Sequence, residues 1–417
     1  MSALRSAGLR WLWSSTLGIG AAQTLDLTAS AWLALESGGG PLTVGAALAA
    51  RALPKLLFGL AAGTVADRFD RRRVVMATGG IGAIAMGAAA WSMVAFGVVP
   101  WQVILISFVG GCLRVTDAPA RQALVLDIVD RERAPNAFAA VSLAELLSKA
   151  AGAFAAGILI AGPGAATCYF AVSASYAWSA ALALPLKRHR ADLRGAIAVP
   201  FARAFSGAAR LVLEVPTIRT LALAAVAAEV FAYSYSSAVP VLVRDVLHSG
   251  PQALGNLTAS AQIGATLALL GLSIVPPRVR REPLLGVAFA AYGVSLIALA
   301  ASSNVVTSAV LMFVTGACAG LFDALQQLLM QLAVPIAQRG RAAGVYQFSI
   351  GSTPLGYLES GAVVGLAGAP TALAMNGAIV VGAAAALLAL APAHRWSGPR
   401  WRAELAAPGS GESSRVA

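Results

Sequence analysis

Long apolar stretches, separated by short groups of turn-forming and charged residues, run through almost the whole chain. Each is close to the roughly 20 residues that a helix needs to cross the hydrocarbon core of a bilayer. Counting the stretches between turn signals predicts about twelve membrane-spanning helices. Their expected positions are 10–36, 42–66, 73–98, 101–128, 136–161, 165–187, 217–246, 252–276, 283–302, 304–335, 341–368 and 370–393. The pattern therefore predicts an all-α membrane protein.

Composition agrees with this interpretation. The 417 residues are 58% hydrophobic and 12% charged, with a mean hydropathy of +0.76, which is too apolar for a soluble protein. The net charge of +12 would fit a nucleic-acid-binding protein, but the basic residues lie in short loops beside apolar stretches, as the positive-inside rule describes. We therefore expect a lipid bilayer as the surroundings and no nucleic-acid partner.

The distribution of positive charge predicts the orientation and the division of the chain. Most of the 30 lysines and arginines lie at the two termini and in alternate loops, so both termini are expected in the cytoplasm. The longest basic loop divides the predicted helices into six and six. We expect an N-terminal bundle over 1–187, a cytoplasmic linker over 188–216, a C-terminal bundle over 217–393 and a cytoplasmic tail over 394–417.

A weak internal repeat supports two related halves. One constant shift along the chain pairs Gly110 with Gly316 and Asp117 with Asp323, and the same shift places Gln23 on Glu229. Paired six-helix bundles that hold a substrate near the membrane midplane are the architecture of many secondary transporters. The repeat therefore predicts a transporter of this kind.

Other functional classes lack their sequence signals. The three cysteines, Cys112, Cys168 and Cys318, have neither disulfide-like nor metal-like spacing. The sequence contains no phosphate-binding GxxxxGK motif followed by Ser or Thr, and no recognisable nucleophile and base that would indicate an enzyme. We expect no catalytic activity, no cofactor and no metal.

Carboxyl groups inside predicted spans are costly and therefore informative. Asp26 shares a helix face with Gln23, and Glu229 lies near Tyr233 and Ser236 on the seventh span. A carboxyl group in a partly dry cavity takes up a proton more readily than one in water. We predict that Asp26 and Glu229 carry protons and that the neighbouring polar residues line the cavity; static hydrogen-bonded helix contacts are the alternative for both acids.

Four further charges lie within spans. Glu145 and Lys149 have the helical spacing and order of an intrahelical ion pair, which we expect to be structural. Arg51 and Lys55 have no acidic partner on their own helix, so they either pair with Asp26 across the cavity or bind an anionic substrate.

The eleventh span also carries polar residues. Glu359 and Tyr346 are predicted to line the opposite cavity wall, with helix packing through small polar residues as the alternative.

A glycine, an acid and a basic cluster separate the second and third spans. The residues are Gly63, Asp67, Arg68, Arg71, Arg72 and Arg73. Their spacing, GxxxDRxxRR, resembles the loop between the second and third helices of the major facilitator superfamily, with Asp70 where the family pattern has its second glycine. We interpret the cluster as a short interhelical loop.

A second segment narrows the resemblance. The run DAPARQALVLDIVDRERAPN from Asp117 to Asn136, together with ADRFDRRR around Asp67, is similar to the enterobactin-exporter-like branch of that superfamily, often called transmembrane secretion effectors. The resemblance implies the major facilitator fold, with twelve transmembrane helices in two pseudo-symmetric six-helix bundles. It also implies export of siderophores, macrolides or similar compounds across a bacterial-type cytoplasmic (inner) membrane.

By the same resemblance, one glycine and seven charged residues form a cytoplasmic gate that latches the two halves in the outward-open state. Its members are Gly63, Asp67, Arg68, Arg71, Arg72, Arg114, Asp117 and Arg121.

The first functional hypothesis is therefore a monomeric, proton-coupled secondary active transporter that exports an amphiphilic small molecule by alternating access. An importer or a lysophospholipid flippase of the same fold remains an alternative. A non-transporting membrane sensor is a further alternative, although the linker and tail are too short and too rich in Ala, Gly, Ser and Arg to bury the core of a signalling domain.

Overall fold

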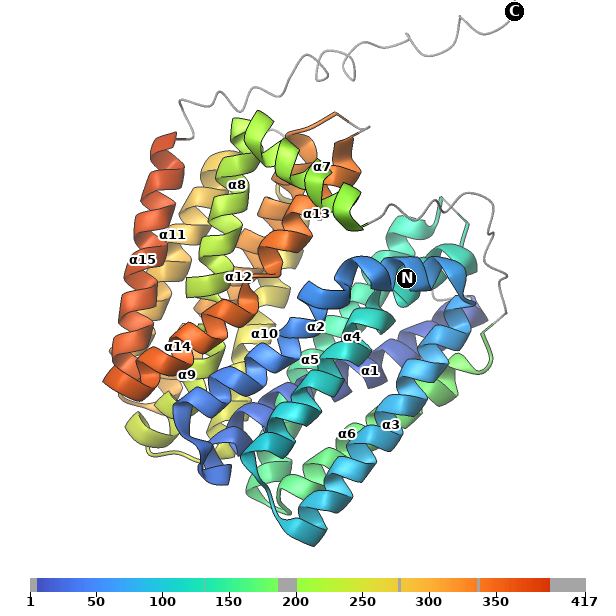
Figure 1. Ribbon diagram of the computed structural model, residues 1–417, viewed down its shortest axis with the longest axis vertical. Coiled ribbons are helices and arrows are strands. Elements are labelled where there is room, and N and C mark those ends of the chain that lie inside the picture. Colours follow the sequence, from blue (N-terminus) through green and yellow to red (C-terminus); the bar gives the residue numbers. More distant parts are fainter. Residues whose placement is uncertain (1–5, 131, 187–200, 277–278, 336–337, 391–417) are drawn as a thin grey trace, which may run out of the picture.

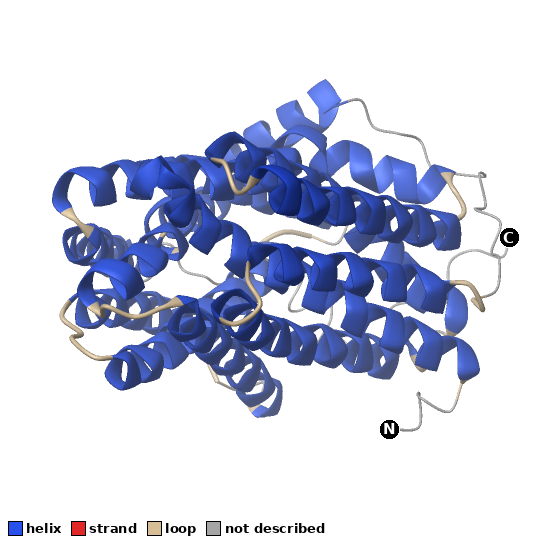
Figure 2. Ribbon diagram, turned by 90° about the horizontal axis from the view of Figure 1, so that it is seen from below, coloured by secondary structure: helices blue, strands red, loops and turns tan. Residues whose placement is uncertain are grey.

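The structure is a computed structural model, and it describes residues 6–130, 132–186, 201–276, 279–335 and 338–390; the side chains of 60–68, 201–205 and 390 are outside the description. Helices account for nearly all of these residues, and the described part contains no strand (Figure 2). The elements of the N-terminal half are α1 (Ala7–Ala34), η2 (Leu35–Gly39), α2 (Gly40–Arg68), α3 (Arg71–Phe96), α4 (Pro100–Ile128), α5 (Ala134–Ala161) and α6 (Ala165–Ala183). Those that follow are α7 (Phe201–Glu214), α8 (Pro216–Ala227), η3 (Ala228–Ala232), α9 (Tyr235–Val241), η4 (Leu242–Val246), α10 (Pro251–Ile274), α11 (Arg281–Ala300), α12 (Val305–Leu332), α13 (Arg339–Ile350), α14 (Thr353–Ala367) and α15 (Ala369–Leu390).

Nine helical stretches of the described residues are long and apolar enough to cross a membrane. Two of them, Ala7–Gly59 and Arg339–Ala389, each contain two predicted spans, because helical structure continues through the turn between them. The predicted sixth span corresponds to α6, which is not one of the nine. This arrangement is compatible with twelve spans and confirms the prediction of an all-helical membrane protein.

The helices form two groups (Figure 1). Helices α1 to α6 pack together, with α1 against α5 and α6, α2 against α4, and α3 against α6. In the second group α10 packs against α12, and α11 against α12 and α15, while the linker helix α7 lies on α8 and α13. The α2–α4 and α10–α12 pairs occupy equivalent places in the two halves, as do α3–α6 and α11–α15. The helix packing therefore follows the repeat that the sequence indicated.

The turn between α2 and α3 is shorter than predicted. The charged cluster was expected to form a loop, but α2 continues to Arg68 and α3 begins at Arg71, so Phe69 and Asp70 alone are non-helical. Asp70 explains the difference, because its side chain accepts a hydrogen bond from the Arg72 backbone N–H at 3.1 Å and caps α3. An aspartate in place of the family's glycine thus starts the next helix directly.

Two predicted spans are interrupted near the middle. The seventh consists of α8, a π-helical turn at η3, α9 and a second π-helical turn at η4. The eleventh breaks at Gly351 and Ser352 between α13 and α14. Irregular helical turns of this kind are frequent at functional sites. Here they position Glu229 within η3 and Thr353 at the start of α14.

The two halves touch mainly at one end of the molecule. Helix α5 contacts α10, where a Cβ on Gly255 would lie 2.9 Å from the Cα of Gly157. Helix α2 contacts α14, where a Cβ on Gly45 would lie 2.4 Å from the Tyr357 carbonyl oxygen. Glycines allow this approach because helix backbones pack closely in a bilayer only where side chains are small. The α1–α2 turn lies at this end and the first turn of α1 at the other (Figure 1).

Replacing Gly157 with leucine is expected to disfavour this contact. The added side chain would meet the Pro251 carbonyl oxygen and the Gly255 Cα, and overpacking of about 1–3 kcal/mol shifts a two-state equilibrium by about 5- to 150-fold. Spin-label distances between cysteines introduced at Ala161 and Ser249 should lengthen. Gly271→Leu, also on α10 but beside open space, is the matched control. An unchanged distance distribution in Gly157→Leu would show that this contact does not hold the halves together.

Candidate functional site

A cavity of about 500 Å³ lies between the two halves, on the inner side of their contact. It extends along α2 from Leu48 to Gly59, away from the end where the halves touch. The lining from the N-terminal half is Leu27, Leu48, Arg51, Ala52, Lys55, Gly59, Gly111, Arg114, Val115, Ala118, Pro119 and Gln122. The C-terminal half contributes Gln347, Ile350, Thr353 and Tyr357. Alternating apolar, amide and charged groups make this wall suitable for an amphiphilic molecule.

Asp26 and Arg51 form a buried ion pair at the edge of the cavity. The Arg51 Nη1 group donates to Asp26 Oδ2, and Nη2 donates to the Gln23 carbonyl oxygen at 2.8 Å. The Tyr169 hydroxyl donates to the other Asp26 oxygen at 3.1 Å. Gly110 leaves room for the pair, because a Cβ there would lie 2.6 Å from Asp26 Oδ2. Of the two roles left open for Arg51, pairing with Asp26 is the one that the structure contains.

A second buried ion pair joins Asp117 and Arg121 on α4, with Nε and Oδ2 2.5 Å apart. Arg121 also donates to the hydroxyls of Ser15 and Ser179, at 2.9 and 2.6 Å, and Asp117 accepts from Thr78 at 3.0 Å. This network connects α1, α3, α4 and α6. All of its members belong to the N-terminal half.

Two other predicted gate residues, Arg71 and Arg72, also bind partners within the N-terminal half. Arg71 contacts Asp127 at 2.5 Å, and Arg72 donates to the carbonyl oxygens of Ala183 and Leu184. In this conformation the described gate residues hold the N-terminal bundle together and do not latch it to the other half. The side chains of Asp67 and Arg68, and the surroundings of Gly63, lie outside the description.

Lys55 and Arg114 point into the cavity from α2 and α4. Neither forms a hydrogen bond or an ion pair with another described residue, and both are accessible from the cavity. The two cations lie close enough to repel each other. The predicted gate residue Arg114 is therefore a cavity residue in this structure.

Glu145 and Lys149 form the intrahelical contact that their spacing predicted, with Nζ 2.6 Å from Oε1. The pair compensates its own charge on α5, which leaves Lys55 and Arg114 as the unpaired cations of this region.

Two acids of the C-terminal half, Glu229 and Asp323, have no cationic partner within 4 Å among the described residues. Glu229 accepts a hydrogen bond from the Thr353 hydroxyl at 2.6 Å, and Asp323 accepts one from the Tyr346 hydroxyl. Lys55 attracts both acids across the cavity. Asp323 was not among the site residues predicted from the sequence. Its pairing with Asp117 in the internal repeat was the signal that could have identified it.

Several predicted cavity residues lie elsewhere. Glu359 contacts Asn376 at 3.2 Å between α14 and α15, and Tyr233 donates to the Ala319 carbonyl oxygen at 3.2 Å. Gln23 and Tyr346 are buried behind the wall. The Gln23 carbonyl oxygen accepts a hydrogen bond from Arg51, and the Tyr346 hydroxyl donates one to Asp323. Ser236 lines a smaller pocket of about 60 Å³ nearer the closed end. Of the residues predicted to line the cavity, Arg51 and Lys55 do so in this conformation.

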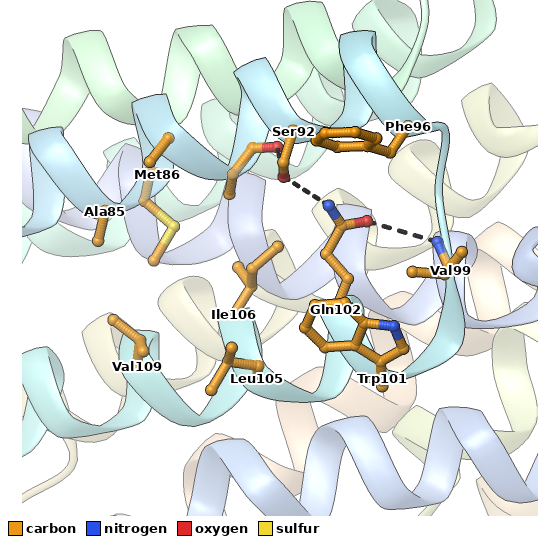
Figure 3. A pocket seen from close by; sticks show the side chains of 12 residues that line it. Ala85, Met86, Ser92, Phe96, Val99, Trp101, Gln102, Leu105, Ile106 and Val109 are labelled. Atoms are coloured by element: carbon orange, nitrogen blue, oxygen red, sulfur yellow. Dashed lines mark hydrogen bonds between the residues drawn. The ribbon is translucent and has the colours of Figure 1, made fainter.

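A groove of about 450 Å³ between α3 and α4 is separate from this site (Figure 3). Gln102 donates to Ser92 at 2.5 Å within it, but the wall is otherwise apolar, and Phe96 and Trp101 are 82% and 67% exposed. The groove therefore faces outward like the rest of the lipid-exposed surface. The described residues contain no group of His, Cys, Asp or Glu side chains that could hold a metal ion.

Comparison with known proteins agrees with this geometry. The family model described as transmembrane secretion effector matches residues 1–407. The chain belongs to this family. It is a membrane transporter of the major facilitator type and not an enzyme, which confirms the resemblance seen in the sequence.

Two curated proteins are similar to most of the chain. The multidrug efflux pump Tap of Mycolicibacterium fortuitum is 25% identical over 85% of this chain and 88% of its own length. The staphyloferrin A transporter of Staphylococcus aureus is 24% identical over 78% of this chain and 82% of its own length.

Solved structures share the fold. A mutant of the nucleoside transporter NupG matches with a TM-score of 0.74 and 15% identity, over 92% of this chain and 99% of that one. An inward-facing bacterial homologue of the human lysosomal transporter Spinster matches with a TM-score of 0.64 and 15% identity, over 94% and 97% of the two chains.

Breaking one member of the Asp26–Arg51 pair should destabilise the protein strongly. In Arg51→Met the buried Asp26 carboxylate loses its compensating charge, which costs about 3–5 kcal/mol. Removing both charges in Asp26→Asn with Arg51→Met should restore most of the loss. Thermal unfolding in detergent measures the effect, and Arg210→Met, which removes an exposed cation, is the control. Equal stability of the single variant and the wild type would show that the pair does not support the fold.

Proposed function

We propose that the protein is a proton-coupled secondary active transporter that moves an amphiphilic small molecule by alternating access. One observation carries the proposal: a cavity between two related halves has unpaired cations on one wall and hydrogen-bonded acids without a cationic partner near the other. The proposed substrate is a siderophore, a macrolide or another drug-like compound, because the cavity has the volume and the mixed polarity of a small-molecule site.

Glu229 and Asp323 are the proposed proton carriers. Each is bonded to a neutral hydroxyl, so it can gain or lose a proton without stranding a buried partner charge. Asp26, also a candidate from the sequence, would have to change charge beside Arg51, and its role as a carrier therefore stays a prediction.

Alternating access requires the closed end to open and the opposite end to close. The glycine contacts of α5 with α10 and of α2 with α14 are the surfaces that would separate. The gate residues at the ends of α2 and α4 would then form contacts between the halves, as the family resemblance implies. This conformation would correspond to the inward-open state of a monomer with both termini in the cytoplasm, embedded in the cytoplasmic membrane.

Export is the first proposed direction, supported by the similarity to an efflux pump over most of the chain. Uptake is the second candidate, and the charge pattern of the cavity favours it. Protonation of Glu229 and Asp323 would remove the negative charges that attract Lys55 across the cavity, so a proton and an anion would bind together, as in a symporter.

Neutralising the proposed carriers should abolish proton coupling. A thermal-shift screen against siderophores, macrolides, lysolipids and dyes would first supply a transported compound. In liposomes containing a pH-sensitive dye, Glu229→Gln and Asp323→Asn should reduce compound-driven proton movement to the level of protein-free liposomes. The direction of movement under an imposed pH gradient separates export from uptake.

Glu132→Gln, which changes an exposed acid in a loop, is the control and should behave as the wild type. Full proton movement in both cavity variants would refute these two carriers. Substrate movement that is independent of any pH gradient in the wild type would refute proton coupling altogether.

A further inference from the structure

Lys55 and Arg114 present an unresolved electrostatic problem within the membrane region. An ionised side chain at this depth costs on the order of 3 kcal/mol or more unless it has a partner or water. Two like charges that share one cavity raise that cost, since they also repel each other. The positions therefore call for a counter-charge within the cavity.

Glu145 attracts Arg114, but none of the described acids of the N-terminal half is at ion-pair distance from Lys55 or Arg114. Asp26, Asp117 and Glu145 are each taken by another cation, namely Arg51, Arg121 and Lys149. The N-terminal wall therefore keeps two positive charges in excess. Across the cavity Glu229 and Asp323 attract Lys55, but neither reaches ion-pair distance in the described structure.

The groups around the two cations suit a molecule with one anionic end. Arg114 offers a planar fork of donors that matches the oxygens of a carboxylate or phosphate, and Lys55 adds a point charge. Gln122 and Gln347 supply amide groups, while Leu27, Leu48, Val115 and Ile350 provide apolar surface. An oxyanion could bind at the cations while an apolar body lies along the remaining wall.

We propose that Lys55 and Arg114 form an anion-binding subsite, and that the substrate is an amphiphile bearing a carboxylate or phosphate group. This inference rests on the proposed transport function, because it assigns the class of compound that the same cavity carries.

The two acids across the cavity, Glu229 and Asp323, should weaken anion binding when they are ionised. Glu229 is bonded to Thr353 and faces Lys55 and Asp323, and Asp323 is bonded to Tyr346 and faces Lys55 and Lys149. When ionised, these acids repel a bound anion and attract Lys55 away from it. Removing their charge should therefore strengthen anion binding, whereas removing Lys55 or Arg114 should weaken it.

Matched ligand pairs test the subsite on the full-length protein in detergent. The probes are amphiphilic aryl carboxylates, aryl phosphates and the uncharged methyl esters of both, with affinities obtained from the concentration dependence of thermal unfolding. The anions should bind about 10- to 100-fold more tightly than their esters. The carboxylate and phosphate arms identify which oxyanion is preferred.

Variants assign the effect to the two cations. Lys55→Met and Arg114→Met should each lose that preference while ester binding stays unchanged, and Lys55→Arg should retain it. Glu229→Gln should bind the anions more tightly than the wild type. Arg210→Met, which removes an exposed cation on α7, should match the wild type. Neither cation holds a structural partner, so folded variants are expected, as size-exclusion chromatography would verify.

Equal binding of anions and esters, or an unchanged preference in both methionine variants, would overturn the subsite. The proposed function fails by a different measurement, the absence of proton-linked movement of any compound in liposomes. A protein that prefers anions but moves no protons would keep the subsite and lose the coupling.

Discussion

Compensation of charge inside the bilayer is the constraint on which the rest of this structure depends. With no water to solvate it, an ionised side chain there needs a partner, a wet cavity or a neutral form. The N-terminal half meets the constraint with partners, as in Asp26 with Arg51 and Asp117 with Arg121. Hydroxyls from several helices complete both networks, so α1, α2, α3, α4 and α6 are joined by polar contacts that would be costly to break.

The C-terminal half meets the same constraint differently. Asp323 occupies the repeat position of Asp117, but Gln327 stands four residues later where the first half has Arg121. Asp323 is therefore held by a tyrosine hydroxyl, as Glu229 is held by a threonine hydroxyl. One fold thus carries two electrostatic arrangements, buried ion pairs in the N-terminal half and, in the C-terminal half, two acids that are hydrogen-bonded to neutral hydroxyls. This asymmetry supports the proposed placement of the proton carriers in the C-terminal half and of the anion-binding subsite in the N-terminal half.

Packing at the closed end complements this arrangement. The halves meet there through glycines on α5, α10, α2 and α14, which bring helix backbones together with few side chains between them. Such a contact buries no charge and breaks no ion pair when it opens. The halves can separate at this end while each bundle stays intact, which alternating access requires.

The sequence by itself determined the all-helical membrane fold, the two-half repeat, the family and the Glu145–Lys149 contact, because these depend on local hydropathy, on motif spacing and on the pitch of one helix. Tertiary structure decided the rest. Packing between helices paired Arg51 with Asp26 and brought Lys55 and Arg114 into one cavity. It also bonded Asp323, like Glu229, to a neutral hydroxyl, and Glu359 to Asn376 on α15. Side-chain partners in a helical membrane protein come from different helices, and helix rotation and tilt are set by packing between them. A linear pattern shows that a charge lies within a span, but the neighbouring helices determine what it faces.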